Sequence, residues 1–129
     1  MPKSITINGD LIHDIPSFYE EINRIFMAEE DWKIGNSLDA FDDMLYGGFG
    51  IIKANESVQL HWLNSENSRK ALGFELTQKY YSEKLKAVAY NKKIIEEKLS
   101  ALEKGTGPTY FEILLEIISE HKNIHLNLY

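Results

Sequence analysis

Three aspartates, Asp39, Asp42 and Asp43, lie close together near the middle of the chain. Carboxylates grouped in this way can do two kinds of chemistry. In a cleft that moves their pKa values apart, a pair can act as general acid and general base. On an open surface, they can pair with the lysine and arginine side chains of a cationic partner. Which of the two applies depends on the element that carries them.

The residues around these aspartates are predicted to form a short helix with one buried side. Asn36 or Ser37 can supply the N-cap, and Gly47 suits the left-handed position just after a helix end. One side of this helix carries apolar residues at helical spacing, namely Leu38, Phe41 and Leu45. The opposite side carries polar, acidic and aromatic residues, namely Asn36, Asp39, Asp43 and Tyr46. Asp42 falls at the edge of the apolar stripe. We therefore expect an acidic surface rather than a buried carboxylate pair.

Asp39 and Asp43 differ in how well the helix tolerates them. Asp39 lies in the first turn, where the positive end of the helix dipole favours an anion. Asp43 lies in the last turn, where the dipole disfavours an anion, and it is one turn away from the like charge of Asp39. A helix that bears this cost is predicted to use the carboxylate for binding.

Residues 37–47 read SLDAFDDMLYG, and they form a motif that is found in a known family. This motif resembles the barstar family, which consists of intracellular protein inhibitors of barnase-type ribonucleases. Gly35 matches the glycine of the family's binding loop, and the resemblance also takes in residues 58–62 and the predicted last helix and strand. In that helix, Glu116 matches the family's second acidic contact.

The resemblance implies an inhibitor that binds a barnase-like ribonuclease in its cationic cleft, where anionic RNA otherwise binds. Asp39 and Asp43 would be the central carboxylates and Glu116 a peripheral one, while Gly35 would allow close backbone approach. The other residues predicted to contact the partner are Asn36, Ser37, Asp42, Tyr46, Gly47 and Trp32. No catalytic residue is expected.

The sequence departs from the family pattern at several of these positions. Lys33 and Ile34 stand where the type member has adjacent tyrosines, and Trp32 is displaced by one position. Asp42 stands where an aromatic residue is found, and Tyr46 stands where a threonine is found. These differences leave open a second interpretation, in which the protein is the immunity protein for a different basic nuclease toxin.

The pattern of elements predicts an α/β fold, with a small three-stranded parallel sheet packed by four to five helices, as in barstar. Alternating residues predict strands at 5–7, 57–62 and 124–128, and helical patterns separate them. Because helices connect the strands, the sheet should be parallel with right-handed crossovers. We expect residues 1–129 to form one domain.

An extra helical segment is expected around residues 74–104, as one long helix or as two joined helices with the second beginning near Asn91. Its apolar positions are Tyr81, Leu85, Val88, Ile95, Leu99 and Leu102. Such a seam could form a coiled coil, but it is short, so we expect an added helical layer on the same core. The resemblance says nothing about this segment.

Composition narrows the classes of function. The chain has 129 residues and no cysteine, which excludes disulfides and thiolate chemistry. Its net charge of −6 argues for a cationic partner and against direct nucleic-acid binding. The four histidines are scattered, so no metal site or other cofactor is expected. The sequence has no long apolar run, so we expect neither a signal peptide nor a membrane partner, and we predict a cytoplasmic monomer.

One alternative from a different class is an acid–base enzyme that uses Asp39 and Asp43. Such an enzyme needs the two carboxylates in a cleft. Two aspartates on the outer face of a small helix would both stay solvated, so the enzyme is the less favoured interpretation. A convex acidic ridge would favour the inhibitor, and a deep pocket holding both residues would favour the enzyme.

Overall fold

The computed structural model describes residues 2–87 and 91–129, and it shows three strands and six α-helices in this part of the chain. In chain order these elements are β1 (Lys3–Asn8), α1 (Ile15–Phe26), α2 (Leu38–Leu45), β2 (Val58–Leu63), α3 (Ser65–Ala71), α4 (Phe74–Leu85), α5 (Lys92–Glu103), α6 (Tyr110–Ser119) and β3 (Ile124–Leu128). A 3-10 turn at Gly9–Leu11 follows β1. The predicted α/β class is confirmed, although there are more helices than the four or five expected. None of the helices in the described ranges is long and apolar enough to cross a membrane.

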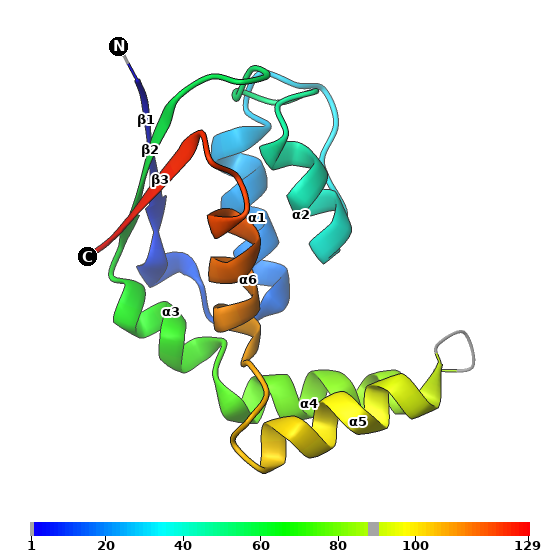
Figure 1. Cartoon of the computed structure of the whole chain (residues 1–129). Helices are drawn as coiled ribbons and strands as arrows, with labels where there is room; N and C mark the ends of the chain where they lie inside the picture. The colour runs from blue at the N-terminus through cyan, green and yellow to red at the C-terminus, as the bar shows by residue number, and fades with distance from the viewer. Residues whose placement is uncertain (1, 88–90) are drawn as a thin grey trace.

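The three strands form one parallel sheet in the order β1-β2-β3, as predicted. Leu60 in the central strand pairs with Ile5 on one side and with Leu126 on the other. Along β2 the buried residues Val58, Leu60 and Trp62 alternate with more exposed ones. The sheet therefore buries one face, and Figure 1 shows α1, α2 and α6 on that side of it.

Aromatic residues from four elements form the centre of the core. The Phe18 ring of α1 packs edge-on against Phe41 of α2 and stacks on Trp62 of β2, with ring centroids 5.5 and 6.0 Å apart. Trp62 also contacts Phe111 of α6, and its indole Nε1 donates a hydrogen bond of 3.0 Å to the Ser68 hydroxyl. Because Phe41 packs on Phe18, which in turn stacks on Trp62, α2 is fixed to the core through α1 and cannot shift without disturbing it.

The segment around 74–104 folds as two helices, α4 and α5, and Asn91 caps the second as predicted. The expected packing on the main core is found at the base of α4, where Leu76 and Tyr80 pack against that core. Figure 1 shows α4 and α5 side by side as a hairpin that extends away from the rest of the molecule. The hairpin has its own small cluster of buried residues, Tyr81, Ile95 and Leu102, with Tyr80, Leu85 and Leu99 packed around it. Val88, which belongs to the predicted stripe, lies outside the described residues.

Two contacts near the base of α4 join the hairpin to the body. The Tyr80 ring packs edge-on against Tyr110 of α6, with centroids 5.2 Å apart, and the Thr77 hydroxyl accepts a 2.8 Å hydrogen bond from the Tyr110 amide. Tyr110 is itself hydrogen-bonded to Tyr19 of α1, and burial raises the pKa of Tyr19 to about 12. The base of the hairpin is thus fixed to α1 and α6, whereas its own buried cluster is separate from the main core.

Candidate functional site

The helix α2 forms as the sequence predicts. Ser37 is its N-cap, and the Ser37 hydroxyl accepts a hydrogen bond from the Ala40 amide. Gly47 follows the last turn with a φ of +89°. A Cβ at Gly47 would also come within 2.7 Å of the backbone of Lys53 and Ala54, so no other residue fits there. The apolar stripe is confirmed, and Met44 belongs to its buried part together with Phe41 and Leu45.

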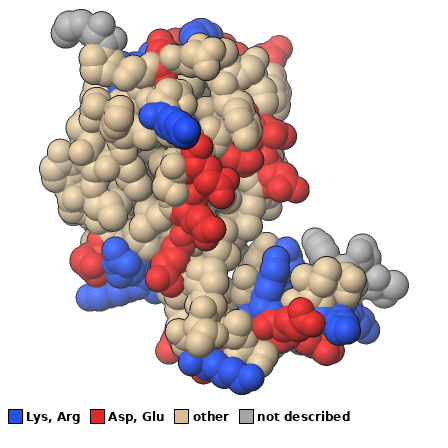
Figure 2. Space-filling view, in the orientation of Figure 1, with Lys and Arg blue, Asp and Glu red and all other residues tan. Residues whose placement is uncertain are grey.

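The outer face of α2 carries exposed acidic and aromatic side chains. Asp39 and Asp43 are exposed one turn apart, and Tyr46 at the end of the helix is 66% exposed. Within the described residues, no lysine, arginine or histidine forms an ion pair with either aspartate. In Figure 2, acidic side chains gather over the side of the body where Figure 1 places α2 and α6. The carboxylates are therefore available to a cationic partner.

Asp42 has an internal partner that the sequence did not reveal. Its Oδ1 lies 2.7 Å from Nε2 of His121, a residue just after α6 whose side chain is only 4% exposed. The Tyr46 ring packs edge-on against the His121 ring, with centroids 4.6 Å apart. Asp42 thus ties α2 to the end of α6, and about a third of its side chain remains exposed. The sequence does not reveal this pairing, because the two residues are far apart in the chain.

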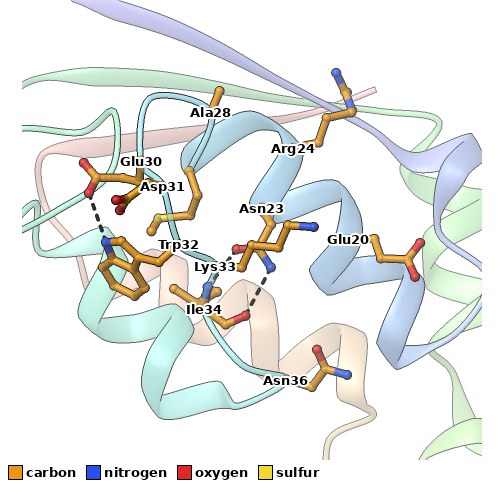
Figure 3. Close-up of a pocket in the computed structure, with 11 residues that line it drawn as sticks. Glu20, Asn23, Arg24, Ala28, Glu30, Asp31, Trp32, Lys33, Ile34 and Asn36 are labelled. Carbon is orange, nitrogen blue, oxygen red and sulfur yellow. Dashed lines mark hydrogen bonds between the residues drawn. The ribbon is translucent and has the colours of Figure 1, made fainter.

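The loop before α2 is held in place by one buried asparagine. The side-chain Oδ1 of Asn23 accepts a 2.9 Å hydrogen bond from the Ile34 amide. Its Nδ2 donates to the carbonyl oxygens of Ile34 and Tyr19, at 3.2 and 2.9 Å. Figure 3 shows both hydrogen bonds between Asn23 and Ile34. The exposed residues Gly35 and Asn36 follow immediately, so they are presented from a fixed point on α1.

Gly35 is not required by the fold itself. A Cβ built at this position would have no atom within 4 Å, and its φ is not in the left-handed region. The space above Gly35 is therefore open to solvent. An open position without a side chain allows the backbone of a partner to approach closely.

Trp32 stands at the edge of the same loop. Its ring packs on Phe49, with centroids 4.8 Å apart, and its Nε1 donates a hydrogen bond to the Glu30 carboxylate. The side chain is nevertheless 45% exposed. Figure 3 shows Trp32 and Lys33 lining an open recess of about 630 Å³ and pointing in opposite directions from the loop. The positive charge of Lys33 is thus kept on the other side of the loop from Trp32.

Glu116 lies on α6, apart from the other predicted site residues. It is exposed and lines a second recess of about 440 Å³, which it shares with Leu38 of α2 and with side chains of the α4–α5 hairpin. The structure therefore brings nine of the ten predicted contact residues together on α2, its preceding loop and Gly47, and it places Glu116 across from the N-terminal end of α2.

The positions of Asp39 and Asp43 do not favour the acid–base enzyme interpretation. Neither Asp39 nor Asp43 lines either of these two recesses. Among the residues that the structure describes, no group of three or more side chains could hold a metal ion. The two carboxylates stand on a convex helix surface, which suits binding to another macromolecule better than proton transfer to a small substrate.

Comparison with protein families matches residues 3–89 to the family described as Barstar (barnase inhibitor). The match runs from β1 through α4 and includes α2, its preceding loop and β2. It ends before α5, α6 and β3, so the position of Glu116 lies outside it. No curated protein sequence matches the chain.

Proposed function

This chain belongs to the barstar family of barnase inhibitors, and from that premise we propose that it inhibits a barnase-type ribonuclease by covering the enzyme's cationic active site. The observation that carries the proposal is the exposed pair Asp39 and Asp43, which have no ion-pair partner among the described residues and stand on a helix fixed to the core. In this proposal they pair with the lysine and arginine side chains that otherwise bind RNA phosphates.

Rigid presentation makes this kind of binding effective. Ordering a loop or a helix on association costs free energy, which a preformed surface avoids. Phe41 fixes α2 to the aromatic core through Phe18 of α1, and Asn23 fixes the loop that carries Gly35 and Asn36. Complementary charge also speeds encounter and discriminates against wrong partners. Barnase and barstar are themselves the reference example of such steering and of acidic hot spots, so this part of the mechanism follows from the family.

The remaining contact residues are proposed for the edge of the interface. Tyr46 and Trp32 are exposed aromatic residues at the two ends of the site, and such residues often anchor interfaces. Ser37 and Gly47 set the two ends of α2. Asp42 can offer its free oxygen to the partner while the other oxygen holds His121.

A second candidate function is immunity to a basic nuclease that differs from barnase. The observation that favours it is the Asp42–His121 pair, because Asp42 stands where the barstar family has an aromatic residue. A carboxylate in place of a ring changes what the partner must present at that position. The mode of binding would be the same, but the target would be a different cationic enzyme.

A titration of enzyme activity tests the proposal. Increasing amounts of the protein are added to a fixed amount of a barnase-type ribonuclease, and cleavage of a fluorogenic RNA substrate is measured. We expect activity to fall linearly to zero at one equivalent. A parallel titration of basic nucleases of other types tests the second candidate function, in which one of those enzymes is the target. Full activity of every enzyme in excess inhibitor would contradict both functions.

A further inference from the structure

The α4–α5 hairpin and the body enclose the recess that contains Glu116. Tyr81 and Lys98 line it from the hairpin, Leu38 and Glu116 line it from the body, and Pro108 closes it near the connection to α6. Figure 2 shows the surface hollowed between the body and the hairpin, on the side where Figure 1 places α2. The recess of about 440 Å³ is large enough to receive several side chains of another protein.

The two walls of the recess carry opposite charges. Lys98 is exposed on the hairpin wall, where Lys84 also lies with its ammonium over the Tyr80 ring, and Glu116 is exposed on the body wall. The structure shows no ion pair between Lys98 and Glu116, nor between either of these two and any other described residue. The charges of Lys98 and Glu116 therefore remain available to groups of the opposite sign.

The recess is continuous with the proposed ribonuclease-binding face. Leu38 is the first residue of α2 and directly precedes Asp39, so the recess begins where the acidic face ends. A protein docked on Asp39 and Asp43 would extend over the mouth of the recess if it also contacts Glu116. The hairpin would then stand beside the bound protein rather than away from it.

We infer that the α4–α5 hairpin is a second recognition surface for the same ribonuclease, and that the recess receives a loop from the rim of its active-site cleft with a carboxylate facing Lys98. This inference rests on the proposed function. The loop would place apolar atoms against Leu38 and Tyr81 and a basic group near Glu116. The hairpin would thereby select nucleases with an acidic group at this point of the rim and repel those with a basic one.

A pair of charge-reversal variants on one helix tests the inference. Lys98→Glu changes the charge inside the recess. Lys93→Glu makes the same change on α5 at a residue that does not line this recess. With the nuclease that the wild-type protein inhibits most strongly, we expect Lys98→Glu to raise Kd by about tenfold or more. Lys93→Glu should raise it by less than about threefold. Circular dichroism verifies that both variants are folded.

Lysine labelling followed by mass spectrometry tests the same contact in the wild-type protein. We expect acetylation of Lys98 to be blocked in the complex, while Lys93 stays reactive. Equal effects of the two substitutions on Kd, or a reactive Lys98 in the complex, would overturn the inference and leave the proposed function standing. Protection of Lys98 in the isolated protein as it self-associates would assign the recess to a second copy and would also overturn the inference. Absence of inhibition by the wild-type protein would remove the proposed function itself and the inference with it.

Discussion

Asp43 is the residue at which local stability and binding are most clearly opposed. It lies in the last turn of α2, where the negative end of the helix dipole disfavours a carboxylate, and one turn from the like charge of Asp39. No ion pair within the described residues offsets these costs. A residue that weakens its own helix in this way is expected where function requires it.

We predict that Asp43→Ala leaves the protein as stable as before, or more stable, and weakens binding. The substitution removes a dipole penalty of about 0.3–1 kcal/mol and a repulsion of about 0.2–0.5 kcal/mol, and it gains helix propensity of up to about 0.7 kcal/mol. Loss of a hot-spot carboxylate should cost at least about 2 kcal/mol of binding free energy. Chemical denaturation and calorimetric titration measure the two effects.

Glu103→Ala is a matched control for Asp43→Ala, because Glu103 is an exposed carboxylate at the last residue of α5. It removes the same charge from the molecule but not from the acidic face, so binding should change little. A clear loss of stability in Asp43→Ala would show that Asp43 has a structural role. Equal binding by the two variants would remove Asp43 from the site.

Asn23 is predicted to matter for binding although it does not face the partner. Asn23→Ala leaves the buried amide and carbonyl of Ile34 without their side-chain partner. Each unpaired buried group costs about 1–3 kcal/mol, so unfolding by denaturant should occur earlier. The loop with Gly35 should also lose its fixed position, and the dissociation rate should rise. Asn67→Ala removes an exposed amide and its 2.7 Å hydrogen bond to the Asp10 carboxylate, and it should cost about 0.5–1.5 kcal/mol of stability without changing the dissociation rate. Unchanged dissociation of Asn23→Ala would show that the loop needs no such support.

At the scale of the elements, the hairpin is predicted to be less stable than the sheet. Among the described residues, its buried cluster consists of Tyr81, Ile95 and Leu102, whereas the main core joins the sheet to α1, α2 and α6. Ile95→Ala should therefore open α4 and α5 while leaving the sheet intact. Hydrogen exchange should accelerate in residues 74–103 and stay slow in β2. Leu60→Ala, in the main core, should accelerate exchange throughout the molecule. An equal acceleration everywhere in Ile95→Ala would mean that the hairpin and the core unfold together.

The elements that local patterns define were predictable, and the contacts between distant elements were not. The N-cap Ser37, the stripe ending at Leu45 and the left-handed Gly47 depend on neighbours in the chain, so the sequence indicated α2 well. The bond from Asp42 to His121 and the bonds from Asn23 to Ile34 join separate elements. No spacing rule reports such contacts, because they depend on how the elements pack.

The packing of the α4–α5 hairpin also could not be predicted from the sequence pattern. The apolar stripe of residues 81–102 indicated that two helices bury a seam, and they do. A stripe does not specify the surface that covers it. Here the two helices mainly cover each other. In the described part of the hairpin, the main core is met near the base of α4, through Leu76, Thr77 and Tyr80.

At the scale of the whole molecule, the net charge of −6 should act on the rate of association. Attraction between the acidic protein and a cationic nuclease is screened as the Debye length falls from about 10 Å at 0.1 M salt to about 3 Å at 1 M. We therefore predict that the association rate constant, measured by stopped-flow fluorescence, falls steeply over this range. The dissociation rate constant should change much less, because it depends on contacts already formed. Association rates that do not vary with salt would contradict steering by charge.

Competition with a nucleic acid tests most directly whether α2 occupies the active site of the nuclease. The affinity of the protein for the ribonuclease is measured by titration in increasing concentrations of a non-cleavable oligonucleotide that binds the enzyme's cleft. If Asp39 and Asp43 take the places of RNA phosphates, the two ligands exclude each other, and the apparent Kd of the protein should rise in proportion to oligonucleotide concentration. A Kd that stays constant, with a ternary complex of nuclease, oligonucleotide and this protein, would contradict the proposal that the acidic helix blocks the active site.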